Sequence, residues 1–359
     1  MIRQALLLCF VSAATSLAQA PGVSAPESAG VQAQSALTAA EREQVLDGVA
    51  AKLKEYYILP DAAEKMLDAL GTHRKNGDYD ALDSAMLAAR LTSDLESVSH
   101  DRHLRVVYSG AVLPEEDEEP SSSDQAIYRR ALERTNCGFK HVDVLPGNLG
   151  YLEFNYFGAP EACADTVAAA MKLLSHTDAL IFDVRQNRGG DPRMVALLMS
   201  YLFDRRTHLT DLYNRREDKT TEYWTAPEKL GTRFATQPVY VLISRSSFSA
   251  AEQFAYDLRN LKRAVLIGER TGGAAHPVRN RRINDHFFIG VPEYKYVDPV
   301  THADWEEAGV TPDVPASGWN SVVVAEHLAE RKLSSTVSNR GAGVDTRAAA
   351  ALRSSTAQR

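Results

Sequence analysis

The sequence has few cysteines, no excess of basic residues and no apolar run long enough to form a membrane helix. Cysteine occurs three times in 359 residues. Asp and Glu outnumber Lys and Arg by 47 to 40, and the formal charge of −7 argues against nucleic acid or an anionic membrane surface as a partner. Beyond the first twenty residues, no segment approaches the roughly 20 apolar residues that a membrane span requires, so we expect no membrane insertion.

The first twenty residues have the organisation of a secretory signal peptide. Arg3 supplies a positive charge, residues 5–11 form a short apolar core, and Ala18-Gln19-Ala20 offers a small-residue cleavage site before Pro21. The sequence therefore predicts a mature protein that starts near Pro21 and is exported, either to the periplasm or out of the cell.

Two cysteines, Cys137 and Cys163, remain after this cleavage, in a compartment where disulfides can form. The sequence does not show whether their backbone geometry allows a bridge. A disulfide and two buried free thiols are both open.

Composition divides the chain into an ordered middle and two polar ends. Three amphipathic helices, the first introduced by the capping box Thr38 to Glu41, indicate a small helical domain. The acidic run at residues 115–119, which lies in the larger domain that follows, is typical of a solvated loop. The predicted segments are a signal peptide (1–20), a disordered leader (21–36), the helical domain (37–100), a larger domain (101–331) with the acidic loop (114–124), and a disordered tail (332–359).

The larger domain alternates strands with helices. Such alternation predicts parallel strands joined by right-handed crossovers, and hence an α/β fold. Polar groups that act together in such a sheet gather where strands end and helices begin. The predicted strands are 149–154, 179–183, 239–243 and 264–267; the predicted helices are 160–175, 192–203 and 250–260, with a polar hairpin at about 208–225.

Ser249 lies where the strand 239–243 turns into the helix 250–260. The first free N–H groups of a helix favour negative charge beside them, which suits a catalytic nucleophile. The same pattern also fits a plain helix cap, because Glu252 three residues later completes a capping box. Local pattern alone favours the cap.

Two further motifs change that balance. Gly189-Gly190 follows the strand 179–183, and Glu306-Glu307-Ala308-Gly309-Val310-Thr311-Pro312-Asp313 lies near the end of the larger domain. Together with the turn at Ser249, this ordered series resembles the tail-specific, or carboxyl-terminal processing, serine proteases. Within them it is similar to the branch of interphotoreceptor retinoid-binding protein and the tricorn protease core.

The resemblance implies a crotonase-like core of repeated β-β-α units with a small amino-terminal helical bundle. It implies Ser249 as nucleophile, with an oxyanion hole formed by the N–H groups of Ala250 and of a glycine in the pair Gly189 and Gly190. Backbone donors of this kind contribute a few kcal/mol to transition-state stabilisation.

The base is the point where the chain departs from the best-known members. Those proteases activate serine with a lysine, and the matching position here is Ala274. A histidine base, as in the tricorn branch, would be His103, with Glu306 supporting it. Arg102 stands where that branch has a serine, which leaves the orientation of His103 open. His276 is the rival base, and a chain with no competent base is the third possibility.

Two functions are compatible with these motifs. The first is an exported serine peptidase that acts on a peptide or protein substrate. The second is a binding protein for a hydrophobic ligand on the same scaffold, with a pocket lined by aromatic side chains. The sequence indicates no cofactor, and no pair of histidines has metal-site spacing. The candidates for that lining are Phe154, Tyr156, Phe157, Trp224 and Trp305.

Overall fold

The structure is a computed structural model that describes residues 37–115, 121–318 and 320–335. The predicted signal peptide and leader, the centre of the acidic loop and most of the predicted tail lie outside these residues. The chain forms two compact units. None of the helices in the described ranges combines the length and apolar character needed to cross a bilayer.

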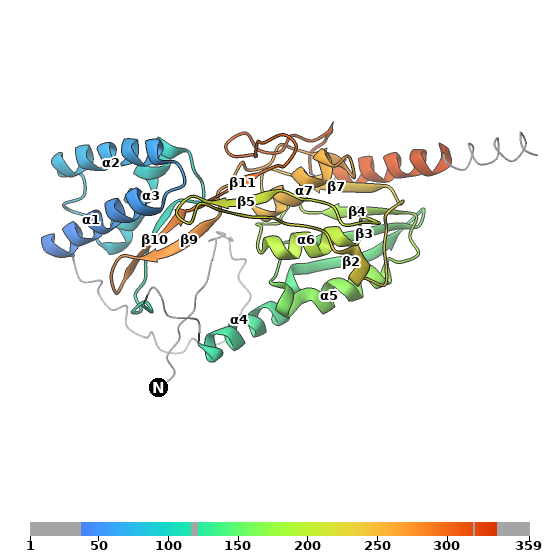
Figure 1. The fold of residues 1–359 in the computed structure, drawn as a ribbon, viewed down its shortest axis with the longest axis horizontal. Helices are drawn as coiled ribbons and strands as arrows, with labels where there is room; N and C mark the ends of the chain where they lie inside the picture. Colours follow the sequence, from blue (N-terminus) through green and yellow to red (C-terminus); the bar gives the residue numbers. More distant parts are fainter. Residues whose placement is uncertain (1–36, 116–120, 319, 336–359) are drawn as a thin grey trace, which may run out of the picture. The chain divides into compact units, whose positions relative to one another are not determined.

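The first unit, called the helical unit here, takes in the described residues up to 127 apart from 101–103, together with residues 278–292. The capping box that opens its first helix is confirmed, since Glu41 donates its N–H to Thr38 Oγ1 and accepts the N–H of Thr38. Figure 1 shows its helices in blue and its late strands in orange. Its elements are α1 (Ala39–Tyr56), α2 (Pro60–Lys75), α3 (Ser84–Ser99), β1 (Arg105–Tyr108), β9 (Val278–Arg282) and β10 (Phe287–Pro292).

The helical unit contains an antiparallel sheet, in the order β1-β10-β9, that the sequence pattern did not predict. Apolar faces of α1, α2 and α3 pack with β1 and β10 into one core, in which Val49, Leu91 and Ile289 are fully buried. The unit therefore includes strands from residues that the sequence pattern assigned to the larger domain.

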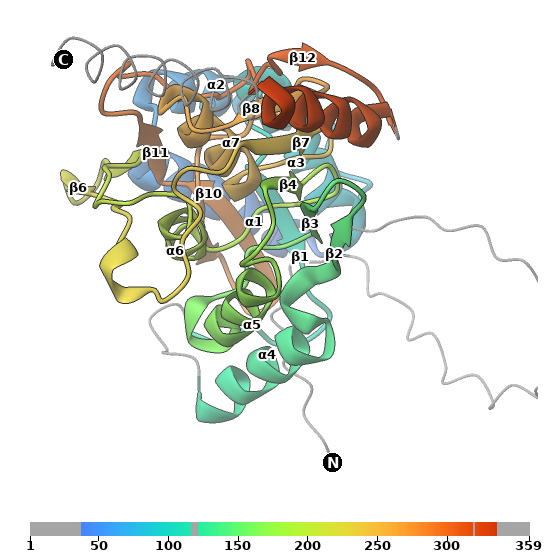
Figure 2. The same cartoon turned by 90° about the vertical axis from the view of Figure 1, so that its right-hand side faces the viewer.

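The second unit, called the sheet unit here, confirms the expected α/β fold. Its main sheet has the order β12-β8-β7-β4-β3-β2, in which β2 alone runs antiparallel to its neighbour. The strands can be followed in Figures 1 and 2. They are β2 (Phe139–Leu145), β3 (Leu149–Phe154), β4 (Ala179–Asp183), β7 (Val239–Ile243), β8 (Val265–Gly268) and β12 (Val314–Pro315).

Helices cover both faces of this sheet, which explains why β4 and β7 are continuous apolar runs. Phe182 and Val241 face a core shared with α5, α6 and α7. Ile181 and Leu242 face a second core, shared with the helix over residues 320–335. The helices on the first face are α5 (Pro160–Leu173), α6 (Pro192–Ser200) and α7 (Ala250–Asn260).

Several smaller elements complete the chain. A three-stranded antiparallel sheet has the order β11-β5-β6. These elements are α4 (Ser122–Arg134), η1 (Asn136–Gly138), β5 (Asp211–Asn214), β6 (Lys219–Thr221), η2 (Pro227–Lys229) and β11 (Tyr294–Val297). The repeated β-β-α units that the family resemblance implies remain a prediction.

A disulfide joins Cys137 to Cys163, which resolves the alternative that the sequence left open. It ties η1, which precedes β2, to α5. A Cβ added to Gly158 would lie 2.5 Å from the sulfur of Cys163, so the disulfide packs directly against the segment that follows β3.

Gly268, at the end of β8, has no room for a side chain. Its φ is +139°, and an added Cβ would lie 1.9 Å from the carbonyl oxygen of Ile243. We expect Gly268→Ala to lower the free energy of unfolding by about 3 kcal/mol, measured by urea denaturation. Gly231→Ala is the matched control, because nothing lies within 4 Å of its added Cβ. Equal effects of the two substitutions would contradict this account of the strand ends.

Candidate active site

Ser249 connects β7 to α7 through a backbone conformation that ordinary helix caps do not have. Its φ and ψ are 54° and −119°, whereas Thr38, the cap of α1, has −66° and 157°. The contact expected of a cap is present, since the Glu252 carboxylate accepts the N–H of Ser249 at 2.8 Å. This φ/ψ pair lies outside the left-handed helical region that non-glycine residues occasionally adopt; such a strained backbone costs roughly 1–3 kcal/mol and clusters at functional sites. The conformation favours a nucleophile over a plain cap.

The glycine pair lies against this turn. An added Cβ on Gly189 would be 2.8 Å from the Cβ of Ser249 and 3.0 Å from the nitrogen of Ala250. An added Cβ on Gly190 would be 2.1 Å from the carbonyl oxygen of Phe157. Both glycines are therefore required by close backbone approach. The glycine loop (184–190) and the nucleophile turn (246–250) therefore meet at one place.

The two glycines differ in what their N–H groups do. Gly189 donates to Oδ1 of Asn187 at 2.8 Å. Within the described part of the chain, neither Gly190 nor Ala250 has an acceptor for its N–H. The predicted oxyanion hole therefore has two available donors, Ala250 N–H and Gly190 N–H.

The buried carboxylate of Glu252 joins the nucleophile turn to the loop after β8. Its Oε1 accepts from the Thr271 hydroxyl at 2.5 Å and from Gly273 N–H at 2.6 Å. Its Oε2 accepts from the N–H groups of Ser249 and Ala274 at 2.8 and 3.1 Å. Burial raises the pKa of Glu252 to about 7, and these hydrogen bonds oppose the shift.

Ala274 occupies the position that the resemblance gives to the catalytic lysine. Its side chain is fully buried. Its N–H donates to Glu252, and its carbonyl accepts from Nε1 of Trp305 at 2.9 Å. This residue supplies no base but anchors the loop in which it lies.

His103 and Arg102 both contact Phe248, the residue before Ser249. The rings of His103 and Phe248 have centroids 4.8 Å apart. The Arg102 guanidinium lies 5.4 Å from the centroid of the same ring, and its Nη1 donates to the carbonyl of Gly272 at 2.8 Å. The arginine that replaces serine in the motif thus holds the turn of His103 against the loop after β8.

His276 is buried between two carboxylates. Its Nδ1 lies 3.1 Å from Oδ2 of Asp101 and 3.7 Å from Oε2 of Glu306. Asp101 also accepts the N–H of His103 at 3.0 Å, and Glu306 accepts the N–H of Ala275. The structure therefore brings the two candidate bases to the same carboxylate, one through its backbone and one through its ring.

The protonation of this cluster is set by burial and by the short distances between its charges. Burial alone lowers the pKa of His276, but the Asp101 hydrogen bond and the charge of Glu306 outweigh it and raise the pKa above its usual value. Burial raises the pKa of Glu306 to about 8 against the opposing charge of His276. A proton is therefore retained in the cluster near neutral pH.

Asp101, His276 and Glu306 are also the one group in the described residues whose ligand atoms could hold a metal ion, lying within 4.8 Å of one another. Imidazole with two carboxylates is a donor set that divalent metals accept. We interpret the cluster as a hydrogen-bonded support for the site, because Asp101 and Glu306 already accept backbone N–H groups.

Two residues of the site were not predicted in these roles. Asp101 stands two residues before His103, a spacing that suits an Asx turn and could have drawn attention to it. Asn187 lies in the motif after β4; its amide donates to the Phe154 carbonyl at 3.1 Å while accepting from Gly189. No local pattern in the sequence distinguishes it from a surface asparagine.

The comparisons with known proteins agree with these features. Residues 148–316 match the profile of peptidase family S41, and residues 31–146 match the N-terminal domain of Peptidase_S41 in eukaryotic IRBP. A carboxyl-terminal-processing protease of Synechocystis is 31% identical over 216 residues, which are 58% of this chain and 46% of that protein. The chloroplastic carboxyl-terminal-processing peptidase 2 of Arabidopsis thaliana is 26% identical over 179 residues, 48% of this chain and 33% of that protein. The chain thus spans less than half the length of these two relatives.

Among solved structures, a putative peptidase from Parabacteroides merdae has a TM-score of 0.54 at 18% identity. The similarity covers 79% of this chain and 92% of that one. At this identity it supports the fold alone.

Glu252 offers a direct test of how the turn is held. We expect Glu252→Gln to lower the free energy of unfolding by about 2 kcal/mol, because glutamine keeps one acceptor oxygen and would leave buried N–H groups unpaired. Urea denaturation measures the change. Glu228→Gln, at an exposed glutamate, is the control and should stay within about 0.5 kcal/mol of the parent. If Glu252→Gln were as stable as the parent, Glu252 would not be the residue that holds the nucleophile turn to the loop after β8.

The cluster around His276 predicts how stability depends on pH. The raised pKa values of Glu306 and His276 mean that the folded state holds protons that the unfolded state releases. For Glu306, this contribution to the free energy of unfolding is fully present below about pH 4.5 and is lost as the pH rises through about 8. We expect Glu306→Gln to flatten the fall in unfolding free energy between pH 5 and pH 9, whereas Glu307→Gln leaves that slope unchanged. Parallel profiles for parent and Glu306→Gln would show that Glu306 does not titrate in this way.

Proposed function

This chain belongs to peptidase family S41, and we propose that it is an exported serine-type peptidase that cleaves peptide bonds through an acyl-enzyme on Ser249. The observation that carries the proposal is the conformation of Ser249, together with the N–H groups of Ala250 and Gly190, which have no acceptor among the described residues. Export rests on the first twenty residues of the sequence. The disulfide between Cys137 and Cys163 supports it, since disulfides persist in oxidising compartments.

In this mechanism the Ser249 hydroxyl attacks the carbonyl carbon of the scissile bond while a base accepts its proton. The negative charge that forms on the carbonyl oxygen is bound by Ala250 N–H and Gly190 N–H, and one such donor contributes about 3 kcal/mol. The base then protonates the leaving amine. Water hydrolyses the ester on Ser249 by the reverse sequence of proton transfers.

We assign the base to His103. Its ring packs on Phe248, the neighbour of Ser249 in the chain, and its backbone is held by Asp101. His276 is the weaker candidate, because its Nδ1 already lies between Asp101 and Glu306. Glu306 then supports the base indirectly, through the buried cluster in which Asp101 contacts both His276 and the backbone of His103.

Protein substrates cut near their carboxyl ends are the class we propose. The relatives named carboxyl-terminal-processing proteases support this choice. Because the chain spans less than half of their length, the substrate class is part of the proposal.

The alternative function, a binding protein for a hydrophobic ligand, finds less support. Phe154, Phe157 and Trp305 are core residues with 2% exposure or less. Trp224 stacks on His208 with ring centroids 4.2 Å apart. An apolar cavity lined by Phe154 and Phe157 measures about 10 Å³, which is far below the volume of a typical ligand pocket.

Covalent labelling with a fluorophosphonate probe tests the proposed function. We expect mass spectrometry to locate the adduct on Ser249 and to find none in Ser249→Ala. His103→Ala should slow labelling by about 10²–10⁴-fold through loss of the base. His327→Ala, at an exposed histidine of the helix 320–335, is the control and should label like the parent.

Two outcomes would change these assignments. Unchanged labelling of His103→Ala together with slow labelling of His276→Ala would move the base to His276. No adduct on Ser249, together with saturable binding of an apolar ligand, would favour the binding protein. A separate assay tests the proposed substrate class. It compares how the parent protein cleaves peptides with free and with amidated carboxyl ends.

A further inference from the structure

A polar cleft of about 370 Å³ lies in the sheet unit where β4, β7 and β8 end. Ser246, the first residue of the nucleophile turn, lines it, but Ser249, Ala250 and Gly190 do not. The cleft therefore lies next to the nucleophile turn without including the residues assigned to catalysis, and both are built on the loops that follow β4 and β7. Its lining residues are Glu153, Asp183, Arg185, Gln186, Ile243, Ser244, Arg245, Ser246, Glu269, Ala316, Gly318 and Ser321.

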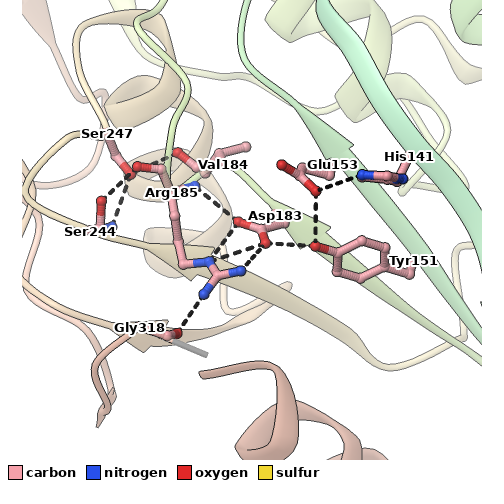
Figure 3. A network of polar contacts seen from close by, with 9 residues as sticks. All are labelled: His141, Tyr151, Glu153, Asp183, Val184, Arg185, Ser244, Ser247 and Gly318. Carbon is pink, nitrogen blue, oxygen red and sulfur yellow. Dashed lines mark hydrogen bonds and ion pairs between the residues drawn. The ribbon is translucent and has the colours of Figure 1, made fainter. Parts of the chain in front are cut away.

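Arg185 is fixed in this cleft by the contacts that Figure 3 shows. Its Nε donates to both oxygens of Asp183 at 2.9 and 3.1 Å, its Nη2 donates to the same carboxylate, and its Nη1 donates to the carbonyl of Gly318. The Tyr151 hydroxyl completes the support by donating to Asp183 at 2.7 Å. A guanidinium has five N–H bonds, and these contacts engage three of them. Two remain for another acceptor.

Ser321 provides a second, independent observation. It lines the cleft from the first turn of the helix 320–335, and only 1% of it is exposed. Its hydroxyl has no hydrogen-bond partner among the described residues. A buried hydroxyl without a partner is unfavourable, so its presence points to a polar group that occupies the cleft.

The cleft offers unpaired charges of both signs. In the described part of the chain, neither the Arg245 guanidinium nor the Glu269 carboxylate has an ion-pair partner. The Glu153 carboxylate is 31% exposed and meets only Tyr151, at 3.5 Å, and His141, at 3.8 Å. Three carboxylates against two guanidinium groups disfavour a simple anion. A ligand that carries both charges satisfies both sets.

We propose that this cleft binds a small zwitterion, either a free amino acid or a short peptide. Its carboxylate would be held by Arg185, Arg245 and the Ser321 hydroxyl. Its ammonium group would be held by Glu153 and Glu269. A volume of about 370 Å³ suits a ligand of this size. The proposal concerns binding and does not depend on hydrolysis at Ser249.

Isothermal titration calorimetry on the full-length Ser249→Ala protein tests the proposal without turnover. The probes are L-alanine and L-alanyl-L-alanine, with N-acetyl-L-alanine and L-alanine amide as ligands of a single charge. We expect saturable binding of at least one zwitterion and binding at least about tenfold weaker for both single-charge ligands. The comparison of the two zwitterions distinguishes a free amino acid from a peptide.

Variants then assign the binding to this cleft. Arg245→Gln and Glu269→Gln should each weaken binding about tenfold or more. Arg233→Gln, at an exposed arginine outside the cleft, is the matched control and should bind like the parent. Ser321→Ala should unfold at the same temperature as the parent without ligand and lose the ligand-induced rise in melting temperature.

Three results would overturn the proposal. These are the absence of saturable binding for both zwitterions, equal binding of N-acetyl-L-alanine, and unaltered affinity in Arg245→Gln. The labelling of Ser249 is measured separately, so failure here leaves the proposed peptidase function untouched.

Discussion

One buried carboxylate, that of Glu252, carries the geometry of the candidate active site. It lies in the first turn of α7, where the helix dipole favours negative charge, and it receives four hydrogen bonds from two separate segments. Burial of a carboxylate is costly unless it is paired or hydrogen-bonded. Here the donors that offset this cost are the N–H of Ser249 and groups of the loop after β8. Ser249, the candidate nucleophile, and Ala274, the position where the resemblance implies a lysine, are therefore held by the same side chain.

The loops after β4 and β7 are also joined to each other, residue by residue. Ser244 and Ser247 donate their hydroxyls to the carbonyls of Arg185 and Val184 at 2.6 and 2.8 Å. Phe248 donates its N–H to the carbonyl of Asn187 at 3.1 Å. These hydrogen bonds hold the two loops together at the edge of the sheet where the parallel strands end. The turn at Ser249 and the polar cleft are supported by this same pair.

The sequence predicted three strands of the main sheet to the residue, namely β3, β4 and β7. β4 and β7 are buried along their whole length, and strands buried on both faces read as near-continuous apolar runs. β9 was missed, since Val278–Arg282 is mostly charged and exposed. The helix α2 runs through Gly71 to Lys75, and an added Cβ on that glycine meets nothing within 4 Å.

The candidate site divides in the same way. The turn at Ser249, the glycine pair and Ala250 follow from local pattern and from the family resemblance. The contact between Asp101 and His276 joins residues 175 positions apart, and no local pattern encodes it. The N–H of Gly189 is engaged by the Asn187 amide oxygen, whereas that of Gly190 is not. This difference depends on the position of the Asn187 side chain in the folded loop.

The positive φ of Ser249 also limits what chemistry this position can adopt by mutation. A β-branched side chain is strongly disfavoured in that region of the backbone map, so threonine does not fit there. Cysteine, which branches no more than serine does, fits the same backbone. The backbone at this turn is therefore compatible with replacement of the Ser249 hydroxyl by the thiol of cysteine, but not by the secondary alcohol of threonine.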